Sequence, residues 1–170
     1  MNQTTRKLVV AAMLVALSVA LSTFSIPIGA SRCFPIQHMA NVLCAVFLGP
    51  GYGVMAAFCT SLIRNLMGTG TLLAFPGSMV GAFCCGMMYK LTKKYIPTYI
   101  AEVIGTGVLG GICAYPLATL VMGREAAIFT YVIPFLVSTV GGTIIAAVLI
   151  GVLDKTKALN YLKGVLQGNA

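Results

Sequence analysis

The sequence predicts an all-α integral membrane protein, with a bundle of about six transmembrane helices in a single domain over residues 1–170. Hydrophobic residues make up 59% of the chain, and the mean hydropathy is +0.98. The 11 Lys and Arg residues lie in clusters between long uncharged stretches. Several of these stretches approach the roughly 20 residues that cross the hydrocarbon core of a bilayer. Because backbone amides find no water there, they must pair within helices or a closed barrel.

The first predicted span covers residues 8–26 and ends before Pro27, because proline interrupts a helix. The span follows Arg6 and Lys7, so this part of the chain resembles a secretory signal. The later spans are equally hydrophobic, and we therefore expect the first one to be retained as a helix. An outer loop of mixed polarity is predicted at residues 28–37.

Residues 38–65 allow two interpretations. They form either one kinked span or a hairpin of two short spans, residues 39–48 and 54–63, that turns at Pro50. The remaining predicted spans, and the charged tail after them, are residues 72–89, 97–122, 133–153 and 154–163.

The distribution of cations favours the hairpin, since Lys and Arg collect on the cytoplasmic side of a membrane. With a hairpin, only Arg32, Arg64 and Arg124 lie outside. A single kinked span gives at best seven cations inside against four outside. We therefore predict a multi-pass protein of the cell membrane with both termini cytoplasmic. Topology and lipid headgroups then explain the net charge of +8 better than nucleic acid does. The eight inner cations are Arg6, Lys7, Lys90, Lys93, Lys94, Lys155, Lys157 and Lys163.

The same topology gathers prolines and polar residues in the outer half of the bundle. Proline bends or ends a helix, and broken backbone at membrane depth requires protein or a water-filled cavity around it. We therefore expect an irregular outer half with a polar cavity. The outer prolines are Pro27, Pro35, Pro76, Pro116 and Pro134.

Gln37, His38 and Asn41 form the densest polar cluster, and the last two share one face of a helix. Ionisable groups in a span cost roughly 3 kcal/mol or more and usually face a cavity or a partner. An interfacial histidine wetted by headgroups is an equally good interpretation of His38. Arg32 and Arg64 are interpreted first as headgroup anchors.

Catalysis has little support, and we expect neither an enzyme nor a cofactor. The three acids, Glu102, Glu125 and Asp154, are far apart in the sequence. The chain contains no HExxH, GxSxG or Walker A motif, and its six cysteines show no metal-ligand spacing. Glu102 lies in the inner part of the fifth span. It is either an ion-coupling site or, as we favour, an interfacial residue extending toward Lys94.

Small residues mark faces where helices can approach closely. Two GxxxG pairs, Gly77 with Gly81 and Gly107 with Gly111, are expected to pack within the bundle. Ala12, Ala16 and Ala20 repeat every four positions on the first helix. This alanine face serves either internal packing or a partner protein, and physical arguments alone leave the choice open.

The stretch GASRCFPIQHMANV at residues 29–42, with Gly49, Pro50 and SLIRN at residues 61–65, resembles the ThiW family. That family is similar to the substrate-binding S components of energy-coupling factor (ECF) vitamin transporters. It is associated with uptake of hydroxyethylthiazole, the thiazole precursor of thiamine. The resemblance implies about six helices, a pocket near the outer face and no ATPase activity of its own. It also implies a transmembrane T subunit that docks on the alanine face and carries two cytoplasmic ATPase subunits.

A ligand of about nine non-hydrogen atoms gains at most about 1.5 kcal/mol per atom, so tight binding requires nearly complete burial. The outer loop at residues 28–37 is expected to close over the ligand as a lid. The outer face offers only Glu125 and three arginines, which favours a neutral ligand. Tyrosines in this region also suit an aromatic belt at the membrane interface. The candidate hydrogen-bonding groups are Gln37, His38, Asn41, Asn65 and Arg32, and the candidate walls are Phe34, Tyr115 and Tyr131.

Three rival functions stay open at the level of sequence. The first is an S component for thiamine or another vitamin. The second is a stand-alone ion-coupled carrier, whose uptake would survive ATP depletion. The third is a membrane enzyme that acts on lipid headgroups with His38 as base.

Overall fold

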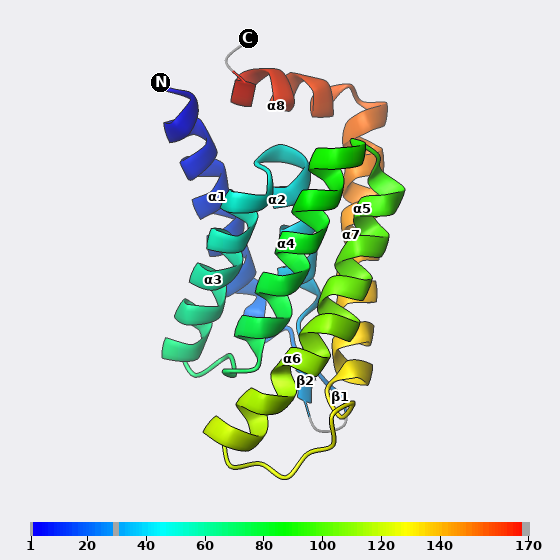
Figure 1. Ribbon diagram of the computed structural model, residues 1–170. Helices are drawn as coiled ribbons and strands as arrows, with labels where there is room; N and C mark the ends of the chain where they lie inside the picture. The colour runs from blue at the N-terminus through cyan, green and yellow to red at the C-terminus, as the bar shows by residue number, and fades with distance from the viewer. Residues whose placement is uncertain (1, 29–30, 168–170) are drawn as a thin grey trace.

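The fold is a helical bundle, described by a computed structural model over residues 2–28 and 31–167 (Figure 1). Both described ends of the chain lie at one end of the bundle, and a small β-hairpin lies at the other. Among the described residues, three helices are long and apolar enough to cross a membrane, Gln3–Thr23, Tyr95–Val121 and Val132–Lys155, and they match three of the predicted spans. The first helical segments are α1 (Gln3–Ala20), η1 (Leu21–Thr23), α2 (Pro35–Phe47), α3 (Pro50–Leu66) and α4 (Ala74–Thr92). They are followed by α5 (Tyr95–Glu102), η2 (Val103–Gly110), α6 (Gly111–Pro116), η3 (Leu117–Val121), α7 (Val132–Lys155) and α8 (Ala158–Gln167).

Residues 38–65 form two helices with a turn between them, as the hairpin interpretation predicts, and not one kinked helix. Helix α2 ends at Phe47 and α3 begins at Pro50. Gly49 between them has φ +90°, a conformation that side chains other than glycine rarely adopt. Proline at the first position of α3 costs no hydrogen bond, since that N–H has no partner within the helix.

Helix α2 is the centre of the bundle, because every residue from Gln37 to Val46 is buried. Its start lies close to α7 at Gly142, where an added Cβ would collide with the carbonyl oxygen of Pro35. The predicted GxxxG pairs pack internally as expected. A Cβ at Gly81 would overlap the hydroxyl of Thr106. A Cβ at Gly107 would lie only 2.4 Å from Leu136 Cδ2, which is closer than real contacts allow.

One feature departs from the all-α prediction. Residues 26–33 contain an antiparallel hairpin of β1 (Ile26–Ile28) and β2 (Ser31–Cys33), with Pro27 opposite Arg32. Helix α1 ends at Ala20, and its continuation η1 ends at Thr23, before the predicted end at residue 26. Ile26 itself is extended, as a residue before proline favours. Part of the predicted lid, residues 29–30, lies outside the described residues.

The elements α5, η2, α6 and η3 form one continuous helix, Tyr95–Val121, which we call the fifth helix. It changes to π-helical winding at η2, directly after Glu102, and again at η3, directly after Pro116. This winding was not predicted from the sequence; it is rare in proteins and concentrates at functional sites. The predicted charged tail instead contains α8, which crosses the end of the bundle where both chain ends lie (Figure 1).

Replacing Gly142 with alanine is expected to destabilise the protein by about 1–3 kcal/mol, because overpacking must push α2 away from α7. The matched control is Gly151→Ala in the same helix, where an added Cβ meets nothing within 4 Å. Thermal unfolding of the detergent-purified variants measures the difference. Equal melting temperatures for the two variants would contradict the close approach of α2 and α7.

Candidate substrate-binding site

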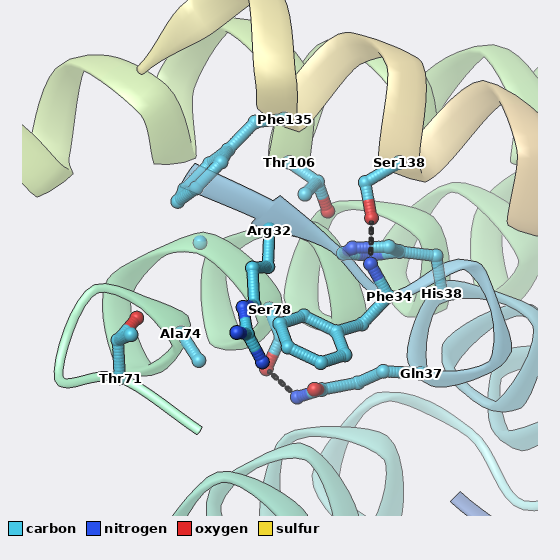
Figure 2. Close-up of a pocket in the computed structure, with 11 residues that line it drawn as sticks. Arg32, Phe34, Gln37, His38, Thr71, Ala74, Ser78, Thr106, Phe135 and Ser138 are labelled. Carbon is cyan, nitrogen blue, oxygen red and sulfur yellow. Dashed lines mark hydrogen bonds between the residues drawn. The ribbon is translucent and has the colours of Figure 1, made fainter. Parts of the chain in front are cut away.

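A small cavity lies where β2 and the start of α2 meet α4, the fifth helix and α7 (Figure 2). The volume that the centres of water molecules can occupy in this cavity is about 30 Å³, which is room for roughly two waters. The cavity is therefore nearly filled by its own side chains. Its lining residues are Arg32, Phe34, Gln37, His38, Thr71, Ala74, Gly77, Ser78, Thr106, Phe135 and Ser138.

The segment entering α2 is fixed to α7 by two hydrogen bonds. The Phe34 amide donates to Ser138 Oγ at 2.8 Å, and the Cys33 thiol donates to the Pro134 carbonyl at 3.1 Å. These bonds join the β-hairpin to the bundle and set the position of the Phe34 ring beside the cavity. The hairpin is thus attached to the site at its α2 side.

Gln37 and Arg64 form one half of a buried polar network. The Gln37 amide nitrogen donates to Ser78 Oγ at 2.9 Å and to Ser61 Oγ at 3.0 Å. Its carbonyl oxygen accepts a short hydrogen bond from Arg64 Nη1. The Arg64 guanidinium carbon lies 3.6 Å from the centre of the Phe34 ring, a cation–π contact.

The interpretation of Arg64 as a headgroup anchor was wrong. Its side chain is 1% exposed and lies inside the bundle. The Gln37 carbonyl and the Phe34 ring replace part of the hydration that a membrane interface would have provided. This compensation arises between α2 and α3 in three dimensions, so the position of Arg64 in the sequence did not reveal it.

His38, Asn41 and Glu102 form the other half of the network. Glu102 Oε1 lies 3.2 Å from His38 Nδ1 and accepts hydrogen bonds from Asn41 Nδ2 and Thr106 Oγ1, both at 3.0 Å. Asn41 Nδ2 also donates to the Ser78 carbonyl at 3.1 Å. His38 and Thr106 line the cavity, so Glu102 lies directly behind its wall.

Two expectations about acids were therefore wrong. Glu102 is 0% exposed and does not extend toward Lys94. The expectation of a site without an acid nearby also fails, since Glu102 contacts two lining residues. The spacing of Glu102 and Thr106, four residues apart on one helix face, is the local signal in the sequence for this contact.

The structure brings only part of the predicted site together. Arg32, Phe34, Gln37 and His38 line the cavity, and Asn41 supports it from behind. Asn65, Tyr115 and Tyr131 do not line it.

Two of these three residues, Asn65 and Tyr131, have a structural role elsewhere. The Asn65 amide donates to the Ser61 and Thr71 carbonyls, which ties together the connection between α3 and α4. Tyr131 is buried in an apolar cluster with Leu73, and its ring centre lies 6.4 Å from that of Phe135. Phe135, which the sequence analysis did not single out, is thus the second aromatic wall after Phe34.

The alanine face of α1 does not pack inside the described chain. Ala12, Ala16 and Ala20 are exposed and line an apolar groove of about 580 Å³ between α1 and α3. Met55 and Cys59 of α3 form part of the opposite side.

The sequence profile of the thiamine-precursor transporter protein ThiW matches residues 8–156. The chain belongs to the ThiW family. A solved structure described as "Structure and mechanism of the S component of a bacterial ECF transporter" has a TM-score of 0.75 and 21% sequence identity to it. The similarity covers 91% of this chain and 98% of that one, so the chain has the S-component fold. No curated protein matches the chain significantly.

Removing the Glu102 carboxylate is expected to destabilise the protein, since Glu102→Ala leaves His38 Nδ1 and Thr106 Oγ1 without the hydrogen-bonding partner that they have in the network and removes one of the two bonds of Asn41 Nδ2. We expect a loss of about 2 kcal/mol, within the range for one buried donor or acceptor left without a partner. Glu102→Gln keeps an acceptor oxygen and should lose less. Glu125→Ala, which changes an exposed acid, is the control and should unfold at the wild-type temperature. A Glu102→Ala protein as stable as this control would contradict the network.

Proposed function

We propose that this ThiW protein is the substrate-binding S component of an ECF transporter and captures hydroxyethylthiazole at the outer face. The observation that carries the proposal is the cavity beside the β-hairpin, in a chain with the family's sequence and the S-component fold. A T subunit and two ATPase subunits supply the energy, and the substrate is released to the cytoplasm. The chain acts as a transport protein and catalyses no reaction.

The proposed topology has six membrane spans and both termini in the cytoplasm. Support comes from the bundle, in which the start of α1 and the whole of α8 lie at the end opposite the β-hairpin (Figure 1). Lys90, Lys93 and Lys163 lie near one another at the end with the termini, as the positive-inside rule requires of a cytoplasmic face. The cavity then opens toward the outside.

The proposed ligand is held by a few polar groups and two rings. His38 and Gln37 are the hydrogen-bonding candidates for the hydroxyl and the ring nitrogen, and Arg32 of the hairpin lines the same cavity. Phe34 and Phe135 provide the aromatic walls in a chain that has no tryptophan. Space for about two waters cannot hold nine heavy atoms, so binding requires movement of lining side chains and the hairpin, followed by closure as a lid.

Thiamine is the second candidate ligand, and Glu102 is the observation that favours it. A buried carboxylate next to His38 could balance the permanent cation of thiamine. The small size of the cavity favours the thiazole, so a direct comparison of the two ligands is decisive.

Calorimetric titration of the detergent-purified protein is expected to show one hydroxyethylthiazole site per chain. His38→Ala should weaken binding at least tenfold, because it removes a polar group that lines the cavity. Tyr115→Phe is the control, since Tyr115 does not line the cavity and should bind as wild type. Binding of thiamine alone would change the ligand, and binding of neither by folded protein would reopen the carrier and enzyme alternatives.

The groove between α1 and α3 is the proposed docking surface for the T subunit. Small exposed side chains at Ala12, Ala16 and Ala20 let another helix approach closely. The apolar groove would then be covered by that helix in the assembled transporter.

Ala16→Phe is therefore expected to reduce co-purification with the T and ATPase subunits at least tenfold while ligand binding stays unchanged. Met13→Phe adds a ring to the same helix at an exposed position outside the groove and serves as the control. Equal assembly of the two variants would place the docking surface elsewhere.

A further inference from the structure

A second polar cavity lies at the opposite end of the bundle from the candidate substrate site. Four lysines line it, Lys7 from α1, Lys90 and Lys93 from the end of α4, and Lys163 from α8. The turn between α2 and α3, at Gly49 and Pro50, forms another part of its wall, and the volume is about 470 Å³. We call it the lysine cavity.

The positive charge of the lysine cavity is not neutralised by the described residues. Among residues 2–28 and 31–167, the one contact between a basic and an acidic side chain joins His38 and Glu102, and neither of them lines this cavity. Asp154 is exposed and does not line the cavity. Four ammonium groups that converge without a carboxylate repel one another, and an anion placed between them would relieve this repulsion.

One lysine is held in place by aromatic side chains. Lys163 Nζ donates to the Tyr89 hydroxyl at 2.6 Å and lies 5.2 Å from the centre of the Tyr89 ring and 5.4 Å from that of Tyr95. Lys93 Nζ lies 5.6 Å from the same Tyr89 ring. The two rings stack with 6.0 Å between centres, so they form a rigid support that keeps both ammonium groups beside the cavity.

The backbone adds positive potential from a third direction. Helix α3, 17 residues long, begins at Pro50 without a side-chain cap, so the positive end of its dipole lies at the cavity wall. Gly86 of α4 lines the cavity as well, and a Cβ there would lie 2.6 Å from Pro50 Cα. This close approach brings the end of α4 and its lysines next to the start of α3.

We propose that the lysine cavity binds a phosphate group, either the headgroup phosphate of an anionic phospholipid or a soluble phosphate. Phosphate suits the site because several oxygens can accept hydrogen bonds from separate ammonium groups at once. The bound phosphate would connect α1, α4 and α8 through Lys7, Lys90 and Lys163. This would fix the end of α1, a helix whose only buried residue among those described is Ser18.

The test compares two double variants at the same end of the molecule. Lys90→Gln with Lys93→Gln removes two exposed lysines of the cavity. Lys155→Gln with Lys157→Gln removes two exposed lysines that do not line it. The pairs are matched, since each contains one lysine with positive φ, 55° at Lys93 and 58° at Lys157. Lys7→Gln on α1 is a single variant from a separate helix.

Native mass spectrometry of the full chain with phosphatidylglycerol and phosphatidylcholine tests the lipid source. Thermal unfolding with inorganic phosphate, against chloride at equal ionic strength, tests the soluble source. Near a membrane surface each lysine contributes about fivefold to the affinity for an anion. We expect the cavity pair to weaken binding of the effective probe about 25-fold, Lys7→Gln about fivefold, and the control pair less than twofold.

Preferential binding of phosphatidylglycerol with this order of variants assigns the site to a lipid headgroup. Stabilisation by inorganic phosphate with the same order assigns it to a soluble anion. Equal losses in the two pairs would reduce the effect to general surface charge and overturn the proposal. Absence of any selective response to either probe in folded wild-type protein would overturn it as well.

Discussion

The bundle depends on one constraint, which is that the polar side chains of the buried helix α2 must find their hydrogen-bonding partners inside the protein. Gln37 links to Arg64 and Ser78, and Asn41 links Ser78 to Glu102. The result is a continuous polar network from α3 through α2 and α4 to the fifth helix. Arg64 lies at one end and Glu102 at the other, and each is held by hydrogen bonds from or to neutral polar side chains. In a low-dielectric interior such bonds matter because an unpaired buried polar group is costly.

The glycines of α4 and α7 make this network possible. Polar side chains bond across helices only where the backbones are close, and Gly81 and Gly142 provide the space that Thr106 and Pro35 occupy. A Cβ at Gly81 would also lie 3.0 Å from Glu102 Oε2. Close helix packing and buried polar bonding are therefore one feature of this fold, since each requires the other.

The sequence predicted what local chemistry and topology determine. Gly49 and Pro50 predicted the turn between two short helices, and the GxxxG pairs predicted internal packing. Gln37 and His38 were recognised because polar residues are costly in an apolar helix. The partnership of His38 with Glu102 was missed because it joins residues 64 apart, and no local pattern encodes such a contact. Arg64 was misjudged for the same reason.

The two ends of the bundle differ in how readily their structure can rearrange. At the hairpin end, the cavity has little free volume, so a small ligand requires rearrangement of the surrounding extended backbone and side chains. At the other end, Lys163 is held against Tyr89, and α8 crosses the bundle. Because α2 runs between the two ends and is buried along its length, a movement at its hairpin end meets a fixed structure at its other end. Ligand-dependent changes should therefore concentrate in the hairpin and the start of α2, and the second half of α2 should stay in place.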